Sequence, residues 1–368
     1  MTQTYQISER AFDGLNNLHT LKLQHNRLIA LHNGIFTVVP ALNSLNLLDN
    51  QLETLTYDNL HPIYGNLLRI DSMLNIDGES FMITMWLPQF GWMLAMIMGC
   101  IYQIEGIPGP KIATAKRPKS SPSSQAPTRT PIVPDLCSKA PDMKVICHCS
   151  TDARRLVTKA DCWVLGSDLS RKDPIWSTFF AHTSITEVKF ITFAEGNLTY
   201  VPSRAIQILS ILSKLSISFT QITEVGAYAL SNATHLAKLE FTNNTQLRSL
   251  RRFAFANHPV LFDVNLEANH ISEIEVQAFV NLPHLEVLRL GYNNITLLPD
   301  DVFGTLGVLK HLQMQHNQIA QLSRDIFKGL GNLLSLDISS NNLTFVGNTV
   351  FAELWSLQEL AMQNNKIE

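Results

Sequence analysis

Four cysteines form a compact cluster in the sequence. Cysteines so placed form disulfide bonds or bind zinc as thiolates, and His148 would be a further candidate zinc ligand. Cys-x-Cys is a poor zinc spacing compared with Cys-x-x-Cys, and no second such pair exists. We therefore expect two disulfide bonds and no metal site, and the spacing does not choose among the three possible pairings. The cluster consists of Cys137, Cys147, Cys149 and Cys162.

Asparagines in Asn-x-Ser/Thr sequences are acceptors for glycosylation in the secretory pathway. Any single one arises easily by chance, but all five in this chain follow the cysteine cluster. Disulfides also require an oxidising compartment. Together these features predict an extracellular or cell-surface glycoprotein. The acceptors are Asn197, Asn232, Asn243, Asn294 and Asn342.

No pattern in the sequence supports catalysis. There is no glycine-rich phosphate loop, no nucleophile elbow and no His-x-x-x-His pair. His311 and His316 are expected near one another on the surface, where most such histidines are simply solvated. The formal net charge is −3, so the chain lacks the excess of basic residues that is typical of nucleic-acid-binding proteins. We expect a binding protein rather than an enzyme, with no cofactor and no nucleic-acid partner.

A 24-residue repeat positions these residues. Five asparagines recur at this interval, each within the frame Leu-x-x-Leu-x-Leu-x-x-Asn-x-Leu, in which Ile, Met or Val replaces some leucines. Four phenylalanines recur at the same interval. A period of this length predicts a solenoid, in which each unit buries its apolar face against its neighbours. The two series are Asn269, Asn293, Asn317, Asn341 and Asn365, and Phe279, Phe303, Phe327 and Phe351.

The frame also predicts local structure. The alternation Leu288-Arg289-Leu290 has a period of two, as in a short strand with one buried face. One strand in every repeat requires a parallel sheet, with return segments crossing over the back. The asparagine follows the strand, where its amide can hydrogen-bond a turn on each side. We expect the phenylalanines to stack as a buried spine.

On these frames the chain resembles the extracellular leucine-rich-repeat family, whose secreted and cell-surface members typically use the 24-residue form with Phe on the return segment. The resemblance implies an α/β solenoid, a leucine-rich-repeat horseshoe. It would have short parallel strands on the concave face and irregular or short helical return segments. Eight repeats fit between residues 185 and 368, some of them degenerate.

The Cys-x9-Cys-x-Cys-x12-Cys run resembles the N-terminal cap of this family and assigns residues 135–184 to a cap. The family usually pairs the first cysteine with the third and the second with the fourth, which implies Cys137–Cys149 and Cys147–Cys162. The cap spacing, the sequence Asp161-Cys162-Trp163 and the repeat style are similar to insect connectin-type adhesion molecules. This similarity implies a protein ligand or a homophilic partner.

Residues 1–77 contain part of a second repeat series. Two clear repeats carry Asn26 and Asn50, and Phe12 precedes them in the spine position. The sequence reaches Glu368 in the middle of a repeat without a C-terminal cap. We therefore expect an exposed final repeat that frays or aggregates when this fragment is expressed alone. Membrane association would come from residues 81–104 or from a C-terminal anchor beyond residue 368.

Residues 78–106 form a hydrophobic segment, and its 24 residues 81–104 carry no charge. As a helix they would be about 36 Å long, enough to span a membrane core of about 30 Å. The flanking charges would then place the cysteines in the cytoplasm, which conflicts with disulfides and glycosylation. Translation from Met82 or Met85 would instead make the segment a signal peptide. A buried core helix is the third interpretation.

We favour the signal peptide. In this hypothesis residues 1–77 are a partial repeat segment joined, by gene structure or by a gene model, to a second complete N-terminus. The Pro/Ser-rich residues 107–134 contain no acidic residue and predict a disordered linker. A basic patch for acidic glycans or lipid headgroups is the alternative interpretation of this linker.

Outward-facing strand positions supply the candidate partner-binding residues, because Tyr and Arg are enriched in interface hot spots. A glycan at Asn243 would obstruct the N-terminal end of the face, so we expect binding around residues 285–340. The predicted function is cell adhesion or cell-surface recognition. The alternatives are a secreted matrix or ligand-scavenging protein, or a receptor ectodomain without its signalling part. The candidates are Arg289, Tyr292, His311, Gln313, His316 and Asp337.

Overall fold

The structure is a computed structural model of the 368-residue chain. It describes residues 7–67, 69, 71–76, 136–137, 143–192 and 196–368. The predicted hydrophobic segment 78–106 and linker 107–134 lie outside the described residues. Among the residues that are described, no helix is both long enough and apolar enough to cross a membrane. Residues 1–83 and 134–368 belong to one compact unit, and the following description concerns that unit.

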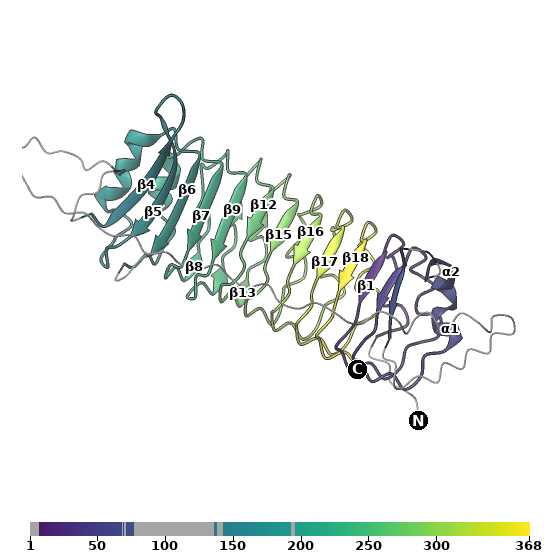
Figure 1. Cartoon of the computed structure of the whole chain (residues 1–368). Coiled ribbons are helices and arrows are strands. Elements are labelled where there is room, and N and C mark those ends of the chain that lie inside the picture. The colour runs from purple at the N-terminus through teal and green to yellow at the C-terminus, as the bar shows by residue number, and fades with distance from the viewer. Residues whose placement is uncertain (1–6, 68, 70, 77–135, 138–142, 193–195) are drawn as a thin grey trace, which may run out of the picture. The chain divides into compact units, whose positions relative to one another are not determined.

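The main sheet of this unit has 13 strands. Figure 1 shows its strands side by side along the repeat array. All neighbouring strands in it are parallel except the first two, which form an antiparallel pair. Eight of the strands, from β6 to β18, match the eight repeats expected between residues 185 and 368. In spatial order they are β4 (Val145–Thr151), β5 (Val157–Val164), β6 (Glu187–Thr192), β7 (Lys214–Ser218), β9 (Lys238–Thr242), β12 (Asp263–Asn265), β15 (Val287–Arg289), β16 (His311–Gln313), β17 (Ser335–Asp337), β18 (Glu359–Ala361), β1 (Thr20–Lys22), β2 (Ser44–Asn46) and β3 (Met73–Asn75).

The return segments hold short elements. Two-residue strands pair from one repeat to the next, and short helices occupy the ends of the array. The strands are β8 (Glu224–Val225), β10 (Ser249–Leu250) and β13 (Glu273–Ile274) in one small sheet, and β11 (Phe255–Ala256) and β14 (Phe279–Val280) in another. The α-helices are α1 (Tyr57–Leu60), α2 (Tyr64–Leu67) and α3 (Ser203–Ile208), and the 3-10 helices are η1 (His61–Ile63) and η2 (Pro174–His182).

The asparagine ladder closes the turn after each strand. The Asn293 side-chain amide donates to the carbonyl of Leu266 in the preceding repeat at 2.9 Å and to that of Leu290 at 3.0 Å. Its oxygen accepts from the backbone N–H of Ile271 at 3.0 Å. Asn293 is buried, so these bonds pair backbone groups that water does not reach. The predicted role of the asparagines is confirmed.

The phenylalanines form the expected buried spine. Phe327 and Phe351 stack with ring centroids 5.8 Å apart. The stack then continues from Phe351 to Phe12 at 6.5 Å and from Phe12 to Phe36 at 6.5 Å. All four rings are at most 1% exposed. The spine therefore passes from the end of the chain to its beginning without a break.

The expectation of an exposed final repeat is not met by the structure. Strand β18 pairs in parallel with β1, and Leu360 lies opposite Leu21 in the register. Both leucines are fully buried. The apolar end of the last repeat is thus covered by residues from the beginning of the chain, because those residues repeat the same frame.

Candidate protein-binding face

Strands β15, β16 and β17 each bury their central residue and leave the two flanking residues half-buried or exposed. The register aligns these outward residues into two rows across neighbouring strands. One row joins Val287, His311 and Ser335, and the other joins Arg289, Gln313 and Asp337. The structure therefore brings three of the six candidate residues, Arg289, Gln313 and Asp337, into a single line.

Two of these candidates are already engaged within the protein. The guanidinium of Arg289 forms an ion pair with Asp263 on the neighbouring strand β12. Lys238 also approaches Asp263, at 3.7 Å. The Asp337 carboxylate accepts the backbone N–H of Ser339 at 2.9 Å and so stabilises its own turn. A partner at this row would meet side chains that are held in place rather than freely rotating ones.

Tyr292 and His316 form the most distinctive contact on the face. Their rings stack at a centroid distance of 4.4 Å with planes 14° apart. Both backbones are left-handed, with φ of 56° and 54°. Tyr292 N–H donates to the Gln315 carbonyl at 2.9 Å, and His316 N–H donates to the Ser339 carbonyl at 3.0 Å. These bonds fix the turn that directs both rings outward, and Tyr292 remains 52% exposed.

The two histidines expected near one another have different neighbours. His311 is exposed on β16, in the row that begins each strand triplet. His316 follows that strand and stacks on Tyr292 of the preceding repeat. The partner of His316 is therefore an aromatic ring from one repeat earlier in the array.

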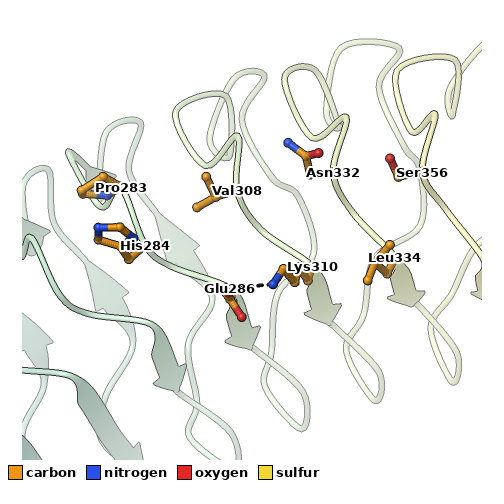
Figure 2. A pocket seen from close by; sticks show the side chains of 8 residues that line it. All are labelled: Pro283, His284, Glu286, Val308, Lys310, Asn332, Leu334 and Ser356. Carbon is orange, nitrogen blue, oxygen red and sulfur yellow. Dashed lines mark hydrogen bonds and ion pairs between the residues drawn. The ribbon is translucent and has the colours of Figure 1, made fainter.

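A hollow at the edge where the strands begin was not predicted from the sequence (Figure 2). It measures about 370 Å³, and Lys310 Nζ lies 2.8 Å from Glu286 Oε1 in its lining. Its apolar lining includes Val308 and Leu334. These residues flank the first leucine of the repeat frame, at positions that the frame leaves variable. The full lining is Pro283, His284, Glu286, Val308, Lys310, Asn332, Leu334 and Ser356.

Exposed apolar side chains extend along the same frame positions in other repeats. Phe262 is 37% exposed, and Lys238 Nζ lies 5.2 Å from the centroid of its ring. Trp355 is 58% exposed. These residues stand one or two positions from the first leucine of a frame, as do Ile211 and Val260. This edge combines apolar area with scattered charge, as interfaces commonly do.

All five predicted glycosylation acceptors are accessible. Asn197 and Asn232 are exposed, and Asn243, Asn294 and Asn342 are half-buried. Asn294 and Asn342 directly follow the ladder asparagines, beyond the ends of their strands. The hollow lies where the strands begin, so the two acceptors and the hollow occupy opposite edges of the same repeats.

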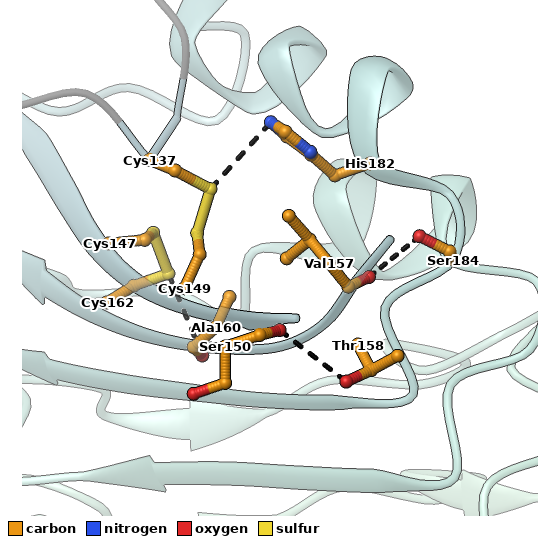
Figure 3. The surroundings of a disulfide bond; sticks show 10 residues. All are labelled: Cys137, Cys147, Cys149, Ser150, Val157, Thr158, Ala160, Cys162, His182 and Ser184. Carbon is orange, nitrogen blue, oxygen red and sulfur yellow. Dashed lines mark hydrogen bonds between the residues drawn. A yellow bond between two sulfur atoms is a disulfide. The ribbon is translucent and has the colours of Figure 1, made fainter. Parts of the chain in front are cut away.

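The cysteine cluster forms two disulfides in the structure, Cys137–Cys149 and Cys147–Cys162 (Figure 3). This is the pairing that the family resemblance implies. Cys147 and Cys162 lie opposite one another on the antiparallel strands β4 and β5. Since every one of these sulfurs is bonded to another, none is a thiolate available to zinc. Within the described residues, no cluster of His, Cys, Asp or Glu is arranged to hold a metal ion.

The cap closes the beginning of the repeat array. Strand β5 pairs in parallel with β6 of the first repeat. Trp176 of η2 is fully buried, meets Phe190 edge-on at 5.9 Å, and donates from Nε1 to the hydroxyl of Tyr200 at 3.1 Å. Burial raises the pKa of that hydroxyl. Hydrogen bonds with Asp168 and Asp173 raise the pKa of Lys144 in the same region.

Comparison with known proteins agrees with this geometry. A model described as a leucine rich repeat matches residues 259–319 and 309–367, and one described as a BspA type leucine rich repeat region matches residues 1–64 and 174–286. The chain is a leucine-rich-repeat protein. Leucine-rich-repeat proteins of this kind are binding or receptor modules. This chain is likewise a binding module and not an enzyme.

Connectin of Drosophila melanogaster is 41% identical to this leucine-rich-repeat protein over 131 residues. The similarity to connectin-type proteins is thereby confirmed. The match covers 35% of this chain and 19% of Connectin, so the chain spans much less than two thirds of that relative.

The chain also matches chains in two solved complexes. A chain of the Toll–Spatzle complex of Drosophila has 19% sequence identity to this chain, and the TM-score is 0.48. The match covers 99% of this chain and 35% of the matched chain. A chain of the TLR13–ssRNA13 complex has 18% sequence identity to this chain, and the TM-score is 0.49. The match covers 99% of this chain and 52% of the matched chain.

Proposed function

We propose that this protein is an extracellular or cell-surface recognition module that binds another protein through the sheet face around residues 285–340. The observation that carries the proposal is the outward-facing stack of Tyr292 on His316. A rigid aromatic pair offers a large contact area and loses little conformational entropy on binding, as hot-spot residues do. The row of Arg289, Gln313 and Asp337 would add polar contacts beside it.

The compartment follows from the cap and the glycosylation acceptors. Disulfides are stable in extracellular and secretory compartments, and two of them hold the cap. Two of the five acceptors are exposed and three are half-buried. Glycans at Asn294 and Asn342 would shield the edge beyond the strand ends. A partner would then approach over the strands and the edge with the hollow, where exposed apolar side chains gather.

The role we propose is adhesion or recognition between cells. The similarity to connectin-type adhesion molecules supports it, over the part of the chain that matches. The ligand would be a protein on an opposing surface, either a different protein or a second copy. No cofactor takes part in this function.

The test is binding by the protein exported from secretory cells. The chain is coupled to fluorescent beads, and the beads are mixed with one another and with an array of displayed ectodomains. We expect aggregation of the beads or capture by a defined ectodomain. The double variant Tyr292→Ala with His316→Ala should weaken that binding at least tenfold, which corresponds to about 1.4 kcal/mol.

The matched control is Phe345→Ala. Phe345 is 44% exposed, but it belongs to a return segment and not to the strand face. Equal binding by wild type and by the Tyr292/His316 double variant would reject this face as the binding site. An absence of any ectodomain partner and of any aggregation would reject the recognition function itself.

A further inference from the structure

The joint between the end and the beginning of the chain repeats the geometry found inside the array. The backbone N–H of Ile367 donates to Asn26 Oδ1 at 3.2 Å. Within the array, Leu343 N–H donates in the same way to Asn365 Oδ1 at 3.0 Å. The Asn26 amide reaches back to the carbonyl of Met362 at 3.1 Å. Asn26 thus occupies the next position of the asparagine ladder.

Three independent ladders agree on one register. Across the joint, Asn365 is followed by Asn26, Leu357 by Leu18 and Phe351 by Phe12. Each pair differs by 339 positions in the sequence. The bridge between Ile7 and Val346 fits the same offset, because these two residues also differ by 339 positions. The register is therefore unchanged along all the described contacts of the joint.

The backbone continues across the joint as well. Ser8 N–H donates to the Val346 carbonyl at 3.0 Å, and Ile7 and Val346 form a parallel bridge. Thr349 N–H donates to the Arg10 carbonyl at 2.9 Å. Lys22 also forms an ion pair with Glu359 on the outward face. The contact therefore combines apolar burial, backbone pairing and charge complementarity.

We infer that residues 7–76 are a non-covalently docked continuation of the repeat array, which closes its β18 end within the same chain. The position next to β18 is specific for residues 7–76, because only a segment with the same frame and period completes all three ladders. Three strands with one edge uncovered make few contacts when alone, since repeat units gain their stability from neighbours. Docking and ordering of this segment are therefore coupled.

Docking within one chain is favoured over exchange between copies. Twelve strand-to-strand steps of about 4.8 Å separate β3 from β4, roughly 58 Å. The 59 residues from 77 to 135 can cover at most about 200 Å, so the covalent connection permits closure in a chain that retains residues 78–106. Removal of these residues as a signal peptide would separate the two parts, so this inference requires the uncleaved chain. A tethered segment has an effective concentration in the millimolar range. Free copies at micromolar concentration do not compete with it.

Cysteine cross-linking of the full chain tests this inference. Thr20 and Glu359 are register partners on β1 and β18, and adjacent strands bring Cα atoms within the range of a disulfide. The variant carries Thr20→Cys and Glu359→Cys in a Cys100→Ser background, with a protease site inserted between Ser120 and Ser121. After cleavage, we expect the two pieces to migrate together without reductant and separately with it.

The control replaces Glu359→Cys by Ser335→Cys on β17. That strand lies one step further away, about 9.6 Å from β1, which is beyond disulfide reach. Linkage of the Thr20/Glu359 pair but not of the Thr20/Ser335 pair supports the inference. Absence of the first link overturns it. Links that join only separate chains into dimers also overturn it, because they would place the segment on another copy.

A second variant pair tests the contact without cysteines. Gly14 has φ of +92°, and a Cβ there would lie about 2.5 Å from the Ala352 carbonyl oxygen across the joint. Gly34 has φ of +74°, but a Cβ there would meet only Thr37 at 3.4 Å. After cleavage, the Gly14→Ala pieces should separate on gel filtration, while wild-type and Gly34→Ala pieces should elute together. Co-elution of the Gly14→Ala pieces to the wild-type extent, or separation of the wild-type pieces, would overturn the inference.

Discussion

The side-chain amide of Asn293 donates to the carbonyl of Leu266 at 2.9 Å, across 27 residues of sequence. It also donates to the carbonyls of Leu290 and Gly291. A single side chain thus ties one repeat to the next. Because the amide is buried, the four backbone groups that it pairs have no water to replace it.

Replacement of this asparagine by leucine tests its structural role. Asn293→Leu preserves the volume but leaves buried backbone groups unpaired, at about 1–3 kcal/mol for each group that finds no new partner. We expect the free energy of unfolding to fall by about 2–5 kcal/mol in urea titration. The control is Gln318→Leu, since Gln318 is exposed one position after a ladder asparagine. Equal stability of the two variants would contradict the ladder argument.

The sequence predicts the array well because its signal is local and repeated. Leu288, Leu312 and Leu336 stand 24 residues apart, and the structure aligns them in one register. Periodicity fixes which face is buried and which strand follows which. Periodicity did not predict the pairing of β18 with β1. These strands lie 339 positions apart in the sequence, and only a direct comparison of their frames would indicate that they are neighbours.

The candidate site was less predictable than the array, because the period fixes backbone positions but not side-chain conformations. The frame places Tyr292 and His316 at the same repeat position, so their proximity follows from the period. Side-chain conformation decides the rest: Arg289 turns to Asp263 and Asp337 to its own turn. The hollow was not predictable because the frame leaves the positions of Val308 and Leu334 variable, and variable positions carry no periodic signal.

We expect the free energy of unfolding to depend on pH through His258. It stands where other repeats carry a buried leucine, as at Leu282 and Leu306, and it is 2% exposed. Burial lowers the pKa of His258, while a hydrogen bond to the Ala233 carbonyl acts in the opposite direction. The folded state therefore binds this proton less readily than the unfolded state, whose His pKa is about 6.5.

The sign follows from proton linkage. Stability is complete above pH of about 6.5 and decreases as the pH falls from there toward the lowered folded pKa, by at most about 1.4 kcal/mol per pH unit for one proton. We expect His258→Leu to flatten this decrease between pH 7.5 and 5.5, with little change at pH 7.5. Thermal unfolding of both proteins across that range measures it. Parallel pH curves for the two proteins would contradict the prediction.

The Cys147–Cys162 disulfide should stabilise the cap. Both residues are buried between β4 and β5, and the loop between them has a sequence separation of 15. A loop of this size corresponds to about 3 kcal/mol in the chain-entropy model. We expect Cys147→Ser with Cys162→Ser to lower the thermal midpoint of the cap and to reduce the secreted yield. Cys100→Ser should leave both quantities unchanged, and a loss of equal size there would argue against a specific role for the cap disulfide.

A glycan introduced at the hollow can map the binding edge. Asn332 is exposed in the sequence Asn332-Leu333-Leu334, so Leu334→Thr creates a glycosylation acceptor in the lining of the hollow. The bulky glycan should abolish binding of the partner or bead aggregation that the wild type shows, and mass spectrometry would report its occupancy. The matched control combines Leu334→Thr with Asn332→Gln, which retains the threonine and removes the acceptor. Asn342 follows the ladder asparagine one repeat beyond His316, at the opposite edge from the hollow. Removal of its glycan by Asn342→Gln should therefore leave binding intact. Full binding by an occupied Asn332 variant would exclude the hollow from the interface and leave the strand face with Tyr292 and His316 as the binding site.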